Sequence, residues 1–136
     1  MNYAAESAAG VSPVGLVIRL YENIAAGLGR AIIAVRDGDI EKRTNQLQHV
    51  LLLIAHLENA LDFEKGGDPA RWLRKFYTMA RARILEAQLK QSGKILEELM
   101  ANFLSIREAW EEVDKQSQSA MASSSPAGSD PSSWVA

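Results

Sequence analysis

The sequence predicts an all-α fold, an antiparallel up-down four-helix bundle with a short N-terminal segment and a disordered C-terminal tail. Apolar residues recur at spacings of three and four along four segments, which is typical of one face of a helix. Capping residues, glycine and proline mark short breaks between these segments, and repeated strand signals are missing. We therefore expect a bundle domain over residues 1–116 and a tail over residues 117–136.

The first predicted helix begins at Ser12-Pro13, where a capping serine precedes proline at the first helical position, and it ends at Asp37-Gly38. The apolar residues of this segment follow the spacing of one helix face: Val14, Val17, Ile18, Tyr21, Ile24, Leu28, Ile32 and Val35. Asp39 is the expected cap of the second helix, which we expect to end at Gly66-Gly67. Its apolar face consists of Ile40, Leu47, Val50, Leu51, Ile54, Leu57 and Leu61.

The third predicted helix begins at Asp68-Pro69, another pair of cap and proline, and the fourth begins at Ser92-Gly93. The third has a shorter apolar face, made of Leu73, Phe76, Ala80, Ile84 and Ala87. The fourth has a series close to a heptad seam: Ile95, Leu99, Phe103, Ile106, Trp110 and Val113. Four segments of similar length joined by short turns favour antiparallel neighbours.

Composition narrows the class of protein. The chain has 136 residues, a net charge of −2 and no cysteine, which excludes disulfides, thiolate zinc sites and cysteine nucleophiles. No basic residue precedes Arg19, so the basic region of a secretory signal is missing. The longest strongly apolar run, Val50 to Ala55, is far shorter than the roughly 20 residues of a membrane helix. We expect a cytoplasmic protein without membrane insertion.

The predicted tail is rich in serine. Eight of its twenty residues are serine and Asp130 is its one charged residue, a composition that cannot bury enough apolar surface to become ordered. Trp134 is unusual in this setting. It is either an isolated exposed aromatic or part of a short docking peptide.

Catalytic motifs are sparse. His49 and His56 lie seven residues apart, but no glutamate stands three positions before either histidine, so a metal site of the di-iron bundle type is not expected. A histidine phosphotransfer domain that uses His49 or His56 is the alternative function. Glu58 next to His56 opposes it, because a carboxylate repels an incoming phosphate. We expect no enzyme activity, no cofactor and no metal.

Charge is unevenly distributed along the chain. Residues 71–94 hold seven cations and one anion, whereas residues 97–114 hold six anions and one cation. Two neighbouring helices with complementary charge explain this pattern. The other interpretation is a basic face with Trp72, Phe76 and Tyr77 stacking on single-stranded nucleic acid. Aromatic residues at helical spacing are more often core, so we expect no nucleic-acid partner.

All four predicted helices carry more apolar residues than their core faces require. Surplus apolar side chains can line a groove that binds amphipathic helices of a partner, and methionine adapts well to such a partner. A wider core with ordinary surface leucines is the other explanation. The candidate groove residues away from the core faces are Leu53, Trp72, Met79, Met100 and Leu104.

Several short motifs follow one another along the chain: Tyr3 ahead of Ser12-Pro13, Leu20-Tyr21-Glu22, Gly38-Asp39, the run from Leu61 to Gly67, Phe76-Tyr77, and Arg107-Glu108-Ala109-Trp110. In their order and spacing they resemble the FliS family of flagellin export chaperones. The resemblance covers about residues 3–115. Trp72, Pro69 and Leu52 depart from the family pattern, which affects the expected shape of the groove near Trp72.

The resemblance implies a four-helix bundle that binds the disordered C-terminal region of flagellin in the cytosol and prevents premature polymerisation. It also implies delivery to the type III export gate, where the loaded chaperone docks on the protein FlhA. Tyr3 is carried over as a partner-contacting residue. The matching positions Pro13, Tyr21, Gly66, Gly67, Tyr77, Arg107 and Trp110 are expected to be mainly structural.

Overall fold

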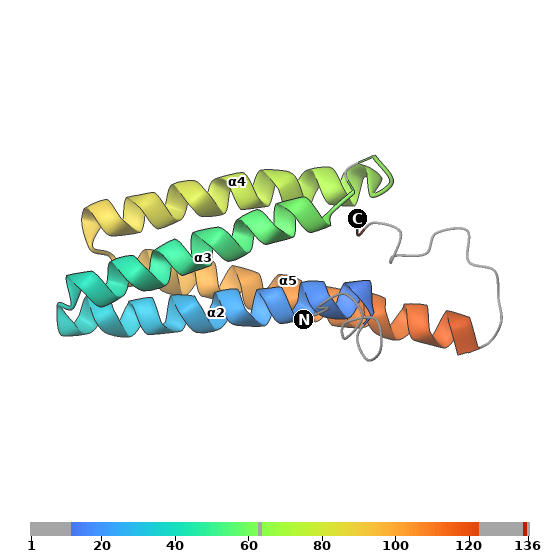
Figure 1. Cartoon of the computed structure of the whole chain (residues 1–136), viewed down its shortest axis with the longest axis horizontal. Coiled ribbons are helices and arrows are strands. Elements are labelled where there is room, and N and C mark those ends of the chain that lie inside the picture. The colour runs from blue at the N-terminus through green and yellow to red at the C-terminus, as the bar shows by residue number, and fades with distance from the viewer. Residues whose placement is uncertain (1–11, 63, 123–134, 136) are drawn as a thin grey trace, which may run out of the picture.

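Four long helices form the part of the chain that the computed structural model describes, residues 12–62, 64–122 and 135. In chain order they are α2 (Pro13–Asp37), α3 (Ile40–Ala60), α4 (Gly67–Lys90) and α5 (Gly93–Ala122). They run alternately up and down, with α3 and α4 forming one layer and α2 and α5 the other (Figure 1). The predicted antiparallel four-helix bundle is confirmed.

Side-chain caps fix the start of three helices at the predicted positions. In each case a side-chain oxygen accepts a hydrogen bond from the backbone N–H three residues later, which satisfies a donor that lacks a partner inside the helix. The pairs are Gly15 N to Ser12 Oγ at 3.0 Å, Lys42 N to Asp39 Oδ1 at 3.0 Å and Ile95 N to Ser92 Oγ at 3.2 Å. Helix α2 ends at Asp37 and is capped by Gly38, whose φ of 69° suits glycine.

The α3–α4 junction differs from the sequence prediction. Helix α3 ends at Ala60 rather than at Gly66-Gly67, because Asp62 provides acceptors for a turn of its own. Its carboxylate accepts from the backbone of Glu64 and Lys65 at 3.1 Å, and its carbonyl accepts from Gly66 N at 2.8 Å. Helix α4 then begins at Gly67, so the predicted cap at Asp68 is wrong. The Asp68 carboxylate pairs instead with Arg71.

Helix α5 is longer than predicted. It continues to Ala122, past the expected tail boundary at Ser117, and extends beyond the first turn of α2 (Figure 1). The added residues include no proline or glycine, so nothing in the backbone interrupts the helix before Ser123. The predicted tail beyond α5, including Trp134, lies outside the described residues except for Val135.

The core is apolar and is centred on α2. This helix packs closely against both α3 and α5, whereas α4 packs more loosely on its two neighbours. Among the described residues no charged or strongly polar side chain is buried, so hydrophobic burial dominates the stability of the bundle. A search of these residues finds no helix long and apolar enough to cross a bilayer.

Candidate functional site

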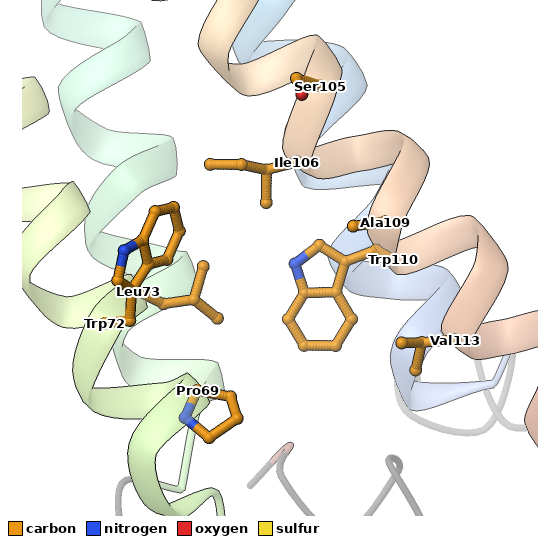
Figure 2. Close-up of a pocket in the computed structure, with 8 residues that line it drawn as sticks. All are labelled: Pro69, Trp72, Leu73, Ser105, Ile106, Ala109, Trp110 and Val113. Carbon is orange, nitrogen blue, oxygen red and sulfur yellow. The ribbon is translucent and has the colours of Figure 1, made fainter.

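An apolar groove lies between the first turns of α4 and the second half of α5 (Figure 2). It has a volume of about 400 Å³, within the size range of sites that bind small ligands or single side chains. We call it the α4/α5 groove. Its lining residues are Pro69, Trp72 and Leu73 from α4, and Ser105, Ile106, Ala109, Trp110 and Val113 from α5.

Trp72 forms the exposed wall of the α4/α5 groove. Its side chain is 56% exposed and its ring stacks parallel to that of Phe76, with centroids 5.7 Å apart. Phe76 is buried and meets Phe103 of α5 edge to face at 5.0 Å. The indole is therefore held against the core while much of its apolar surface faces solvent, an arrangement that suits an aromatic contact residue.

Trp110 lies opposite Trp72, on the α5 side of the groove (Figure 2). It is only 4% exposed, and it hydrogen-bonds the Tyr21 hydroxyl. The Tyr21 hydroxyl in turn lies 2.6 Å from that of Tyr77. Burial raises the pKa of Tyr21 to about 12 and also raises the pKa of Tyr77, so both phenols are neutral at physiological pH. The side chains beneath the groove are thus uncharged and fixed to one another.

Ion pairs hold α5 to its two neighbours. Arg107 lies 3.2 Å from Glu22 of α2 and 2.7 Å from Glu111, and Arg83 of α4 lies 2.8 Å from Glu98. The Arg83–Glu98 pair agrees with the expected attraction between a basic and an acidic helix. The other interpretation of these charges, an aromatic face for nucleic acid, does not fit the structure, because Phe76 and Tyr77 are buried in the core.

The predicted groove residues do not form a single surface. Trp72 lines the α4/α5 groove, and Met79 is exposed on the same helix. Met100 is partly buried on the α2 side of α5, where a Cβ on Gly29 would come within 3.8 Å of its sulfur. Leu104 is exposed on α5 but is not among the lining residues.

The prediction for Leu53 as a groove residue is wrong, and Tyr3 lies outside the described residues. Leu53 is 8% exposed and belongs to the core cluster. The expectation that it lies away from the core face is wrong, because α3 packs against both α2 and α4 and its buried face is correspondingly wide. It is therefore not part of the exposed surface.

Seven lining residues were not predicted as groove residues: Pro69, Leu73, Ser105, Ile106, Ala109, Trp110 and Val113. One signal for them exists in the sequence. Ser105 and Ala109 are small residues four positions apart, so they share one flank of α5. Small side chains on a flank leave space beside a neighbouring helix, and here that space faces Trp72.

The residues of the matching motifs make contacts within the bundle. Pro13 starts α2, and Tyr21 pairs with Tyr77. Gly66 is the tightest position, because a Cβ there would lie 2.5 Å from the Cβ of Ala70. Gly67 has a φ of 59°, a conformation that favours glycine.

The described residues of the groove do not bring metal-ligating or catalytic side chains together. Within the described ranges, no group of three or more His, Cys, Asp or Glu side chains could hold a metal ion. His49 and His56 are both exposed on α3 and do not line the groove. The apolar lining of the groove can bind apolar side chains of another molecule, as a recognition site does.

Comparison with known proteins gives consistent matches. Residues 1–117 match the model of a family described as flagellar protein FliS. The chain is 34% identical to the flagellar secretion chaperone FliS of Campylobacter jejuni over 113 residues, which is 82% of this chain and 88% of that protein. It is 30% identical to the FliS chaperone of Salmonella typhimurium over 103 residues, covering 75% and 76% of the two chains. A flagellar secretion chaperone FliSB of Pseudomonas aeruginosa is 26% identical over 102 residues, 75% of this chain and 81% of that protein. Nothing in these matches supports a phosphotransfer role.

Proposed function

This chain belongs to the FliS family of flagellar secretion chaperones, and we propose that its client is flagellin, bound through the C-terminal region. The α4/α5 groove carries this proposal. It is apolar, it is bounded by an exposed tryptophan, and it contains no reactive group. An amphipathic client helix would place its apolar side chains in the groove and keep its polar face in water.

The proposed mechanism is physical masking. The C-terminal region of flagellin is disordered before assembly and becomes helical on the chaperone, so its apolar stripes are covered while it is bound. Binding lowers the concentration of free monomer by mass action, which delays polymerisation. Folding on binding costs the client on the order of 2–5 kcal/mol, so the complex stays releasable. We further propose that the loaded chaperone works in the cytoplasm and docks on FlhA at the export gate.

The charge around the groove fits a client of mixed polarity. A separate hollow on α4 is lined by Arg71, Arg74, Lys75 and Thr78, and Arg71 directly precedes the groove residue Trp72. Acidic residues flanking the apolar stripe of a client helix would be attracted to these cations at moderate salt.

The deciding experiment mixes the chain with its cognate flagellin and separates the products by size-exclusion chromatography. A stoichiometric complex is expected with full-length flagellin and none with flagellin that lacks its C-terminal region. Separate elution of the two intact proteins would overturn the proposal. Binding that survives removal of the C-terminal region would show that a different part of flagellin is recognised.

A substitution in the groove wall tests the site itself. Trp72→Ala is expected to weaken flagellin binding by about tenfold or more, because large aromatic side chains dominate interface energies. Leu85→Ala is the matched control, since Leu85 lies on the same helix, is 57% exposed and does not line the groove. Titration calorimetry measures both affinities, and the unfolding midpoint should stay nearly unchanged for each variant. Equal losses from the two variants would place the client elsewhere on α4.

A further inference from the structure

Val135 returns to the bundle although it lies 13 residues beyond the last residue of α5. Its backbone forms an isolated antiparallel bridge with Leu61, and its partly buried side chain packs against the core. Thirteen residues span at most about 45 Å when extended, so the tether is long enough to reach the α3–α4 junction from the end of α5.

Leu61 is a suitable partner for such pairing. It is the first residue after α3, and its φ of −93° and ψ of 140° place it in extended conformation. Residues directly opposite each other in an antiparallel pair project their side chains to the same face. Leu61 is buried in the core and Val135 packs on that same core, so backbone pairing and side-chain packing agree.

The sequence after α5 has the composition of a tethered ligand. Residues 123–133 are dominated by serine, with two prolines and one charged residue, Asp130. Apolar residues follow one another only at the tip, Trp134-Val135-Ala136. A polar tether with an apolar end raises the local concentration of that end near the bundle to the millimolar range.

The Val135 contact lies at the α3–α4 junction, which leads directly into α4. Asp62, next to Leu61, accepts a hydrogen bond from Gly66 N at 2.8 Å, and Gly66 packs directly against Ala70 of α4. The same first turns of α4 carry the groove residues Pro69 and Trp72. The junction that Val135 contacts is therefore connected through one tight turn to the α4 wall of the groove.

We propose that the segment containing Val135 is an intramolecular ligand of the α3–α4 junction, held by backbone pairing with Leu61 and by packing of Val135 on the core. This contact forms within a single chain that has no client bound. Its existence is independent of which client the groove binds, so a failure of flagellin binding and a failure of this inference are separate results.

Because the chain has no cysteine, an engineered pair can test the contact directly. Opposed residues in an antiparallel pair have Cα atoms about 4.5–5.5 Å apart, which suits a disulfide. The double variant Leu61→Cys with Val135→Cys should close an intramolecular disulfide in the full-length chain. The matched control is Leu61→Cys with Ala127→Cys, which places the second thiol on the same tether at a shorter separation in sequence.

Under mild oxidation the 61–135 pair is expected to cross-link about tenfold faster than the 61–127 pair, because docking adds to the effect of tethering. Equal or faster closure of the 61–127 pair would overturn the inference. Cross-linking between two copies, seen as a disulfide dimer, would also overturn it by assigning the site to a second chain.

A second measurement avoids changing the buried Leu61. Val135→Asp places a charge at the docked residue, and Ala127→Asp places the same charge elsewhere on the tether. The peptide containing residues 60–62 should exchange its amide hydrogens faster in Val135→Asp than in Ala127→Asp, as measured by mass spectrometry without any client. Identical exchange in the two variants would contradict docking at Leu61.

Discussion

Tyr21 and Tyr77 place two hydroxyl groups inside an otherwise apolar core. Their oxygens are 2.6 Å apart, and Trp110 supplies a further hydrogen bond to Tyr21. Each hydroxyl has a partner, so burial does not leave an unsatisfied polar group, which would cost about 1–3 kcal/mol. The pair connects α2 with α4, and the bond from Trp110 adds α5.

The raised pKa values of these tyrosines predict loss of stability at high pH. Both phenols titrate near pH 10 in the unfolded chain, whereas burial raises the pKa of Tyr21 to about 12 in the fold and that of Tyr77 upward as well. Between these pH values the unfolded chain binds fewer protons than the folded chain. Stability is therefore fully present below pH 10 and falls as the pH rises toward 12, by up to about 1.4 kcal/mol per pH unit for each tyrosine.

Urea unfolding at a series of pH values from 8 to 12 measures this slope. The double variant Tyr21→Phe with Tyr77→Phe is the control, and its stability should depend less on pH above 10 even if it is lower at neutral pH. An unchanged slope in the double variant would show that other groups cause the alkaline loss.

For single residues, the sequence identified the members of short motifs more reliably than it predicted which side chains are exposed. The motif residues Tyr21, Tyr77 and Trp110 could be identified because each stands in a short local pattern. Leu53 and Met100 could not be placed correctly, because exposure depends on how far each helix is rotated toward its neighbours. That rotation is decided by side chains on other helices.

The helices begin where local chemistry requires, so three of the four starts were predictable from Ser12, Asp39 and Ser92. The start of α4 was not, because Asp62 uses its side chain and carbonyl to close the preceding turn. Two acidic residues, Asp62 and Asp68, are both plausible turn formers in sequence. The structure distinguishes them, because Asp62 accepts the hydrogen bonds of the turn and Asp68 pairs with Arg71.

Two glycines in α2 predict opposite results for the same substitution. A Cβ on Gly27 would lie 2.7 Å from Val50 Cγ2, whereas a Cβ on Gly29 would meet only Met100 Sδ at 3.8 Å. Alanine gains up to about 1 kcal/mol of helix propensity over glycine at either site. At Gly27 overpacking against a stiff valine costs about 1–3 kcal/mol, which exceeds that gain.

Gly27→Ala is therefore expected to lower the free energy of unfolding by about 1 kcal/mol, and Gly29→Ala to raise it by about 0.5–1 kcal/mol. Guanidinium unfolding of the two variants measures the difference. If both variants gained stability, the close approach of α2 and α3 at Gly27 would have to relax without cost.

In the molecule as a whole, the helices differ in how tightly they pack against their neighbours. Helix α2 buries ten of its 25 residues and packs closely on two neighbours, whereas α4 buries seven of 24 and packs more loosely. Local opening follows the least secured element. The groove thus lies beside a helix that is packed more loosely than α2.

Amide hydrogen exchange should show this order. Backbone amides in the middle of α4 are expected to exchange before those in the middle of α2 under native conditions, measured by mass spectrometry or nuclear magnetic resonance. Equal protection of the two helices would mean that the bundle opens only as one cooperative unit.

The overall topology was predictable from four segments of similar length and short turns. The α4/α5 groove was not, because it arises from the loose fit between Trp72 on one helix and the small residues Ser105 and Ala109 on another. A spacing pattern describes each helix alone. A groove depends on how well two helices fill the space between them.

The close packing of α2 against α5 joins the first helix of the bundle to the last, and a hydrogen bond from Ser12 to Asp114 spans 102 residues of chain. During synthesis the α2–α3 hairpin can form early, because its contacts are local. The other side of α2 stays uncovered until α5 has left the ribosome. The fold therefore cannot be completed before α5 is made, and a nascent chain stalled before α5 would present an apolar helix face to the cell's chaperones.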